Sequence, residues 1–317
     1  MSAYLVKRLM SMVILVLVVV SVVFFMLHAL PGDPAVTILG GDQGSVNAED
    51  VERLREKMGL NLPLYAQYAD WLGRAVRLDL GTSLVTGRPI MADMGQRIYR
   101  SALLVLPAEL IAVVFGIPLG ILAARLRKTY WDPLLSLFAL IGFSVPVFVS
   151  GLVLILIFAV NLGWFASGGF VDPRQDFAGY LSHAFLPVIA LALGPLAVVI
   201  RMTRSSLLEQ MGLDYVVTAR AKGLAERRVV FSHILRNAML PVITVIGLQL
   251  GTAFAGAVVA ETVFNWPGVG RYLIESIKNR DYPVVQGVVL IVACLYVVLN
   301  GLTDISFAVL DPRVRRR

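Results

Sequence analysis

The stretch LMSMVILVLVVVSVVFFMLHAL, residues 9–30, decides the class of this fold. It contains no acidic residue, Lys or Arg, and it is as long as the roughly 20 apolar residues that a helix needs to cross a hydrocarbon layer about 30 Å thick. A secretory signal peptide has an apolar region of only about 7 to 15 residues. Because this stretch is longer and runs into a Pro-Gly-Asp-Pro sequence at 31–34, we expect a retained helix followed by a turn.

Five further apolar stretches follow along the chain. Their expected bounds are 101–124, 134–160, 184–200, 240–264 and 284–308. Hydrophobic residues make up 58% of the 317 residues and charged residues 15%, whereas about 25% of a soluble domain is charged. The sequence therefore predicts an all-α integral membrane protein with six transmembrane helices.

The distribution of Lys and Arg predicts the orientation of these helices, because short positive loops stay in the cytoplasm. Basic residues outnumber acidic ones in segments 1–8, 125–133, 201–239 and 309–317, and segments 31–98, 161–183 and 265–283 are close to neutral. Both termini are therefore expected in the cytoplasm. The net charge of +7 is explained by basic residues that set the orientation of the helices and contact anionic membrane lipid. We therefore expect no nucleic-acid partner.

The outer segment, residues 31–98, is expected to be a structured insert after the first helix. Asn47 is placed to cap a helix that has Glu49 and Asp50 in its first turn and Gly59 at its end. A second helix is expected from Pro63, because apolar residues recur at helical spacing up to Val76. The insert could either cover the outer ends of the spans or receive an external partner.

The cytoplasmic segment 201–239 is long for a connection inside a compact bundle, which favours a functional role. Asp214 is placed to cap a short helix from Tyr215 to Lys222 that Gly223 would end, and an amphipathic helix is expected over 225–239, before Pro241. An isolated helix this short is marginal in water and needs a surface to pack on. Its small residues Ala219 and Ala221 suit a groove on another protein, although packing on its own bundle remains an alternative.

The sequence contains neither a phosphate-binding G-x-x-x-x-G-K-[ST] motif nor an H-E-x-x-H motif, so we expect no cofactor, no metal and no enzymatic activity of the chain itself. Buried carboxylates in membrane spans usually face protein or water. Glu109 could line a solute path, pair with Arg100 or Arg125, or carry protons in a secondary transporter. The residues that could line a path are Glu109, Ser144, Pro146, Gln249 and Glu261. A hydrolase centred on Ser144 is a more distant alternative.

Several short motifs resemble the peptide and nickel branch of the permeases of ATP-binding-cassette (ABC) importers. The central ones are TARAKGL at 218–224 and HILRNAMLP at 233–241. Others occur in the same order as in that branch: LPGDP at 30–34, GLNLPL at 59–64, DLGTS at 79–83, FNWPGVGR at 264–271, RDYP at 280–283 and DPR at 311–313. The general importer motif begins with E-A-A, which this chain replaces with TARA.

This resemblance implies a type I importer permease fold, with domains 1–96 (first helix and periplasmic insert), 97–308 (core, coupling segment about 201–239) and 309–317 (basic tail). It also implies import by alternating access across a bacterial inner membrane, with di- or oligopeptides, glutathione or nickel as the cargo. The implied partners are a second similar permease, two cytoplasmic ATPases that bind ATP and Mg, and a periplasmic or lipid-anchored solute-binding protein. The implied ATPase-coupling residues are Asp214, Tyr215, Thr218, Ala219, Arg220, Ala221, Lys222 and Gly223.

Overall fold

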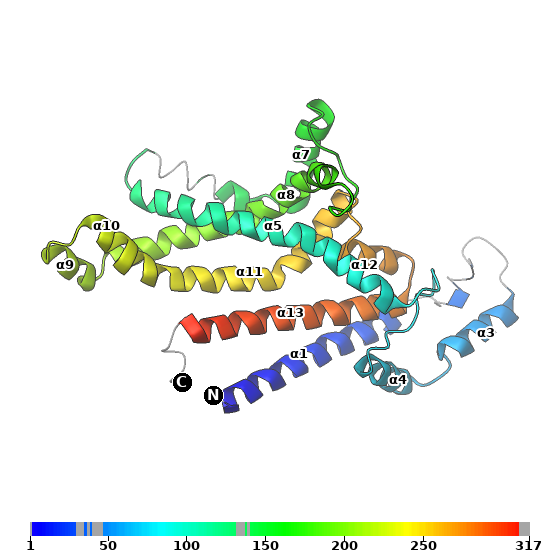
Figure 1. Cartoon of the computed structure of the whole chain (residues 1–317). Coiled ribbons are helices and arrows are strands. Elements are labelled where there is room, and N and C mark those ends of the chain that lie inside the picture. Colours follow the sequence, from blue (N-terminus) through cyan, green and yellow to red (C-terminus); the bar gives the residue numbers. More distant parts are fainter. Residues whose placement is uncertain are drawn as a thin grey trace. The chain divides into compact units, whose positions relative to one another are not determined.

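The described elements of the chain are helices, apart from one isolated antiparallel bridge between Thr82 and Pro89. The structure is a computed structural model that describes residues 2–29, 35–36, 39, 47–130, 137 and 140–310. The helices shown in Figure 1 are α1 Ser2–Ala29, α3 Ala48–Met58, α4 Leu64–Val76, α5 Ile90–Arg125, α7 Val147–Leu154, η1 Ile155–Asn161, α8 Phe177–Met211, α9 Asp214–Ala221, α10 Glu226–Arg228, η2 Val229–Ile234, α11 Leu235–Val263, α12 Val269–Lys278 and α13 Tyr282–Leu310.

Five described helical segments are long and apolar enough to cross a membrane, and each overlaps most of one of the six predicted stretches. They are Met10–Ala29, Ile90–Arg125, Phe177–Met211, Glu226–Val263 and Tyr282–Gly301. The third predicted stretch, 134–160, begins in residues outside the described set, and its later part forms the shorter apolar helix Val147–Asn161. The prediction of an all-α membrane fold is confirmed.

The helix predicted to end before Pro241 does not end there. After α10 and the π-helical turn η2, α11 continues through Pro241 to Val263. Proline removes one backbone hydrogen bond, but neighbouring groups satisfy the freed carbonyl in many membrane helices. The same tolerance is visible at Pro187 and Pro195 inside α8. Pro241 was therefore a poor indicator of a helix end in this apolar setting.

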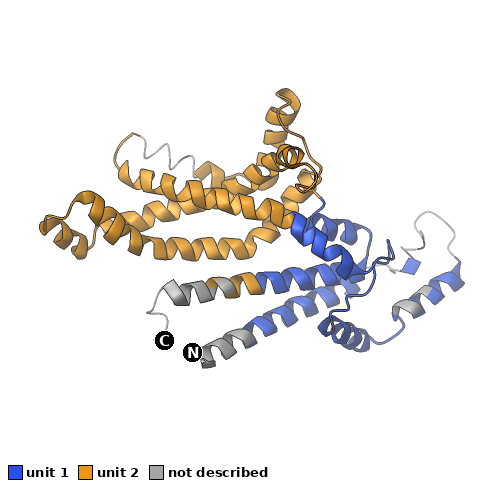
Figure 2. Cartoon of the chain, in the orientation of Figure 1, with its two compact units in different colours: residues 1–100, 267–297 blue, residues 101–266, 298–317 orange. Residues whose placement is uncertain are grey.

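The chain packs as two compact units, coloured separately in Figure 2. Unit 1 comprises residues 1–100 and 267–297, and unit 2 comprises residues 101–266 and 298–317. The sequence-based division into 1–96, 97–308 and 309–317 stays a prediction.

Unit 1 joins the insert to the ends of α1 and α13 through an apolar core. Phe24 of α1, Trp71 of α4 and Val284 of α13 are buried in the same cluster, together with Ile90 at the start of α5. A buried polar contact adds to it, because the Ser83 hydroxyl donates to Oδ2 of Asp281 at 2.6 Å. The insert is thus tied to the helices of its own unit.

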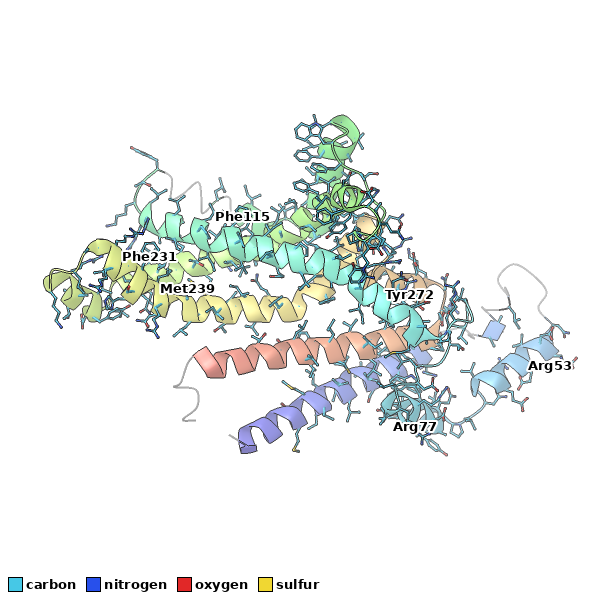
Figure 3. All side chains as sticks on the ribbon, in the orientation of Figure 1. Arg53, Arg77, Phe115, Phe231, Met239 and Tyr272 are labelled. Carbon is cyan, nitrogen blue, oxygen red and sulfur yellow. The ribbon has the colours of Figure 1, made fainter. Side chains whose placement is uncertain are left out.

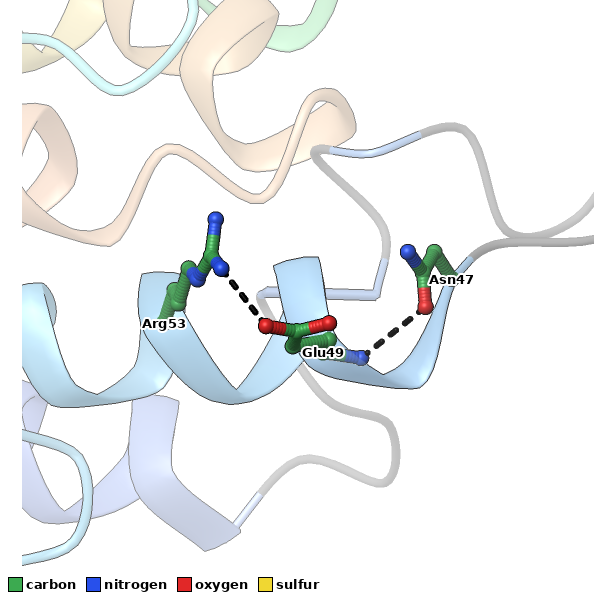
Figure 4. Close-up of polar contacts among 3 residues, drawn as sticks. All are labelled: Asn47, Glu49 and Arg53. Carbon is green, nitrogen blue, oxygen red and sulfur yellow. Dashed lines mark hydrogen bonds and ion pairs between the residues drawn. The ribbon is translucent and has the colours of Figure 1, made fainter.

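Helix α3 of the insert has the local stabilisation that the sequence predicts. The Asn47 side chain accepts a hydrogen bond from the Glu49 N–H, and Glu49 pairs with Arg53 at 2.6 Å (Figure 4). Gly59 ends the helix in the left-handed conformation with φ +68°. The predicted cap and stop signals of this helix are both confirmed.

Unit 2 is built around α8, which α5, α7 and α11 contact. Glycines allow α5 to lie very close to α8: a Cβ at Gly116 would meet the Val199 side chain at 2.7 Å, and Gly120 faces Thr203. The Ser206 hydroxyl of α8 donates a hydrogen bond to the Ala238 carbonyl of α11 at 2.8 Å. Such small-residue contacts are typical of helix packing in membranes.

Candidate functional site

The short helix α9 lies at the end of unit 2 opposite α7 (Figure 1). Its expected cap is wrong: Asp214 is the first helical residue, and Leu213 before it makes no side-chain cap. Asp214 instead places a negative charge in the first turn, where the helix dipole favours one. Gly223 lies one residue beyond the C-cap Lys222 with φ +75°, and its N–H donates to the Arg220 carbonyl at 2.9 Å. The predicted end of the helix is thus confirmed.

One face of α9 is anchored in its own bundle. Val216 is fully buried and Ala219 is nearly so. They share an apolar cluster with Leu207 of α8 and with Val229 and Ile234 of η2. This packing supplies the stability that an eight-residue helix lacks by itself.

The opposite face of α9 is open. The Val217 residue is 60% exposed, and Thr218 and Ala221 beside it are also exposed. The prediction that the small residues Ala219 and Ala221 enter a groove together is wrong, because residues two apart on a helix point in different directions. Ala219 faces the bundle, and the open face is formed by Asp214, Val217, Thr218 and Ala221. We call these four residues the α9 outer face.

Two polar contacts fix the ends of α9. The Arg220 guanidinium donates to both carboxylate oxygens of Glu226, at 2.6 and 3.1 Å, which ties the end of α9 to α10. This hydrogen bond raises the pKa of Arg220 above its usual value. The Tyr215 hydroxyl donates to Oε1 of Gln210 in α8 at 2.8 Å. The segment is therefore held between the end of α8 and the start of α10.

The connection from α9 back into the membrane passes through the π-helical turn η2. Its Phe231 ring, labelled in Figure 3, lies 5.8 Å from the Arg125 guanidinium at the end of α5. Val229, Val230 and Ile234 of η2 are buried. Isolated π-helical turns are often found at functional positions, and this one joins α10, the short helix that follows α9, to the long helix α11.

Glu109 of α5, the first of the predicted path residues, is buried within this chain. It is 6% exposed, and its Oε2 has no hydrogen-bond partner among the described residues. No described ion pair joins it to Arg100 or Arg125. It shares a helical face with Gly116, two turns along α5, and that face packs against α8.

Gln249 of α11 also contacts α8, at about the same level. Its Nε2 donates to the Pro195 carbonyl at 3.4 Å, and its buried Oε1 has no partner among the described groups. Counting two turns back from the contact of Gly116 with Val199 places Glu109 beside residue 192 of α8, within about one turn of Pro195. Two hydrogen-bond acceptors without described partners thus lie beside the middle of α8.

The remaining path residues lie elsewhere. Glu261 is fully buried and accepts a hydrogen bond from the Ser101 hydroxyl, and it is about 18 Å along α11 from Gln249. Ser144 and Pro146 are exposed in the chain, and Pro146 caps α7. The five residues therefore do not form one cluster. Sequence reasoning missed Glu226, Phe231 and Ser206, whose partners are distant or lie in other helices.

The described residues contain no group of three or more His, Cys, Asp or Glu side chains that could hold a metal ion.

Two family models match the chain. The model described as binding-protein-dependent transport system inner membrane component matches residues 116–316, and the model of the N-terminal part of such components matches residues 1–88.

Three similar proteins each match more than nine tenths of the chain. A putative peptide permease protein of Brucella suis biovar 1 is 40% identical, with 99% of each chain covered. The dipeptide transport system permease protein DppB of Escherichia coli K12 is 40% identical with 93% of each chain covered. The glutathione transport system permease protein GsiC of Escherichia coli O6:H1 is 39% identical with 98% of each covered.

A solved structure shares the fold. A chain of the MetNI methionine ABC transporter, in inward-facing conformations, superposes with a TM-score of 0.54 at 16% identity. The match covers 69% of this chain and 96% of that one.

Proposed function

Because the chain belongs to the family of binding-protein-dependent transport system inner membrane components, the permeases of ABC importers, we propose that it imports short peptides by alternating access. The observation that carries this function is full-length similarity to peptide permeases, combined with an exposed helix face anchored on the bundle. The permease hydrolyses no ATP itself. A partner ATPase would supply the energy for transport. The family therefore does not fit the alternative of a proton-coupled transporter that uses Glu109.

The proposed cargo is a di- or oligopeptide, with glutathione as the nearest alternative. The relatives named for dipeptide and glutathione transport support these classes equally well by identity. Nickel is a weaker candidate, because the described residues offer no cluster of metal-binding side chains.

ATPase and solute-binding proteins are the partners of this family. We propose two ATPases, which would bind ATP and Mg, and a second similar permease, so that the translocation path forms between the two permeases. The coupling surface would be the α9 outer face together with Arg220, Lys222 and Gly223. Because Val216 and Ala219 fix α9 to α8 and η2, a push on the outer face would move the bundle as a rigid body.

The chain is a multi-pass protein of the inner membrane. We propose that both termini and α9 are cytoplasmic, which the basic segments at 1–8, 125–133, 201–239 and 309–317 support. The insert with α3 and α4 would then face the periplasm, where the solute-binding protein docks.

Of the predicted path residues, we propose a role in the path for Glu109 and Gln249 only, as groups beside the middle of α8. Both have a side-chain acceptor without a described partner, and both lie within about one turn of Pro195, which lacks a backbone N–H. A bend of α8 at this proline would expose them to cargo or water. Ser144, Pro146 and Glu261 stay untested candidates.

The direct test is to co-express the chain with its genomic neighbours and purify it by affinity. Recovery of ATPase subunits and a second permease, with ATP hydrolysis stimulated by the peptide-loaded binding protein, is the expected result. A chain that purifies alone and transports peptide in liposomes without ATP would overturn the proposal.

The substrate class has its own measurement. In proteoliposomes that contain the whole complex, uptake of a labelled dipeptide should exceed uptake of glutathione when each is presented by its loaded binding protein. If glutathione were taken up and the dipeptide were not, the proposed cargo would change from peptide to glutathione.

A further inference from the structure

A solvent-open cavity lies within unit 1. Its volume is about 680 Å³, within the range of about 300 to 1,000 Å³ typical of small-molecule sites. It lies between the insert and the neighbouring ends of α1 and α13, all within the same unit.

One side of the cavity is aromatic. Phe24, Trp71 and Tyr282 line it, with His28 stacked on Phe24 at a ring distance of 4.2 Å. The Phe24 and Trp71 rings are 6.0 Å apart. These rings are held by the core of unit 1, so this side of the cavity is preformed. Phe24 is 2% exposed, and Trp71 and Tyr282 are each 7% exposed, so only a small part of each ring is open to the cavity, where it suits an apolar side chain.

The other side is charged, with an excess of carboxylates. Three acidic residues line the cavity, Glu56, Asp70 and Asp79, against a single guanidinium, that of Arg74. Arg74 pairs with Asp70 at 2.9 Å, so these two charges largely cancel. Oδ1 of Asp79 accepts the Gly81 N–H at 3.0 Å, which fixes this carboxylate in place. The residues that line the cavity therefore carry a net negative charge. Part of this charge is on the Asp79 carboxylate, whose position is fixed.

The arrangement suits an organic cation better than a metal ion. Metal sites need several ligands on one ion, and the described residues contain no such group of three. An ammonium group needs only one or two carboxylates as hydrogen-bond acceptors. Gln67 and Gln286 also line the cavity and can bond to amide groups of a longer molecule.

We propose that this cavity binds the amino-terminal end of a short peptide, with Asp79 and Glu56 facing the ammonium group and the aromatic side taking the first side chains. The assignment of the ligand as a peptide rests on the proposed function, whereas the preference for an ammonium group rests on the lining charges alone. On the proposed topology the cavity opens to the periplasm, so it would hold peptide on the entry side of the permease.

The test measures binding to the intact purified complex in nanodiscs, without ATP and without the binding protein. The probes are trialanine and N-acetyl-trialanine, titrated by isothermal calorimetry up to about 10 mM. We expect trialanine to bind about tenfold more tightly than the acetylated peptide, because only the former carries a charged donor for Asp79.

Two matched variants locate the site. Asp79→Asn keeps an oxygen for the Gly81 N–H but removes the charge, and it should weaken trialanine binding about fivefold while leaving the acetylated peptide unchanged. Asp50→Asn removes a carboxylate from the same insert outside the cavity and should change neither. Equal binding of the two peptides, equal binding by Asp79→Asn and the parent protein, or no binding at all would overturn the proposal.

Failure of the proposed function would look different. In the same preparation, loaded binding protein would then fail to stimulate ATP hydrolysis, whatever the peptide titrations give. Binding that depends on Asp79 in such a preparation would still support an ammonium site.

Discussion

Helices α3 and α9 are both short and both end at a glycine with positive φ, but they are stabilised in opposite ways. Helix α3 has a side-chain cap at Asn47 and a Glu49–Arg53 pair within its own sequence. Helix α9 has no side-chain cap, and its Val216 and Ala219 are buried against α8 and η2. Local contacts therefore hold α3, and tertiary contacts hold α9. A helix held by tertiary contacts transmits a push to its bundle, whereas a locally stabilised helix can move with its loop.

The largest expected effect comes from Gly223→Pro. The φ of +75° is closed to proline, and the substitution also removes the N–H that donates to the Arg220 carbonyl. We expect ATP hydrolysis stimulated by loaded binding protein to fall about tenfold or more, with membrane insertion intact.

The matched control for this substitution is Gly87→Pro in the insert. Gly87 has φ +67°, and its N–H donates to the Ser83 carbonyl at 2.9 Å, so the local damage is equivalent. ATPase subunits should co-purify normally with Gly87→Pro. Normal stimulation in Gly223→Pro would contradict the role given to α9.

The second effect is the loosening of α9 by Val216→Ala. Truncating a fully buried aliphatic side chain costs about 2 kcal/mol. Because tertiary packing is the main support of α9, we expect its amide hydrogens to exchange at least tenfold faster, measured by mass spectrometry, and ATPase stimulation to fall severalfold. Val76→Ala in α4 is the control, since Val76 is 78% exposed. Unchanged exchange in Val216→Ala would show that α9 is stable without its anchor.

A smaller effect is expected from Glu226→Gln. This substitution removes the charge that Arg220 contacts through two hydrogen bonds, but the pair is exposed and screened by solvent. ATPase stimulation should fall about two- to threefold, and the loss should shrink as salt is raised. Glu52→Gln, which breaks the exposed pair with Arg55 in α3, should leave stimulation unchanged. Equal losses of ATPase stimulation in Glu226→Gln and Glu52→Gln would show that the Arg220–Glu226 pair has no special role in coupling.

The smallest effect on transport is expected from Asn47→Ala. Loss of the cap should destabilise α3 by about 1 kcal/mol. Hydrogen exchange in α3 should therefore rise about fivefold, while ATPase coupling stays at the parent level. Faster exchange in α9 as well would show that the two helices are not independent.

The same difference explains what could be predicted from the sequence. The bounds of α3 follow from Asn47, Glu49 and Gly59, which act over a few residues. The prediction that Asp214 caps α9 was wrong, because packing of Val216 on the bundle sets where this helix begins. Pro241 was misread because its effect depends on the surroundings of the helix.

The candidate site shows the same limit. The coupling segment could be located from its length and motif, and its end from Gly223. The burial of Ala219 and the pairing of Ser101 with Glu261 could not be predicted, since Ser101 and Glu261 lie 160 positions apart in the sequence. The cavity of unit 1 also escaped prediction, because its lining comes from α1, the insert and α13.

The most direct measurement of the central claim is photo-crosslinking from α9 in the assembled complex. A benzophenone amino acid would replace Val217 of the α9 outer face, or the exposed Val76 of α4 as the reference position. The account predicts a crosslink to an ATPase subunit from position 217 and none from position 76. Absence of the crosslink from position 217, in a complex that still contains its ATPases, would contradict it.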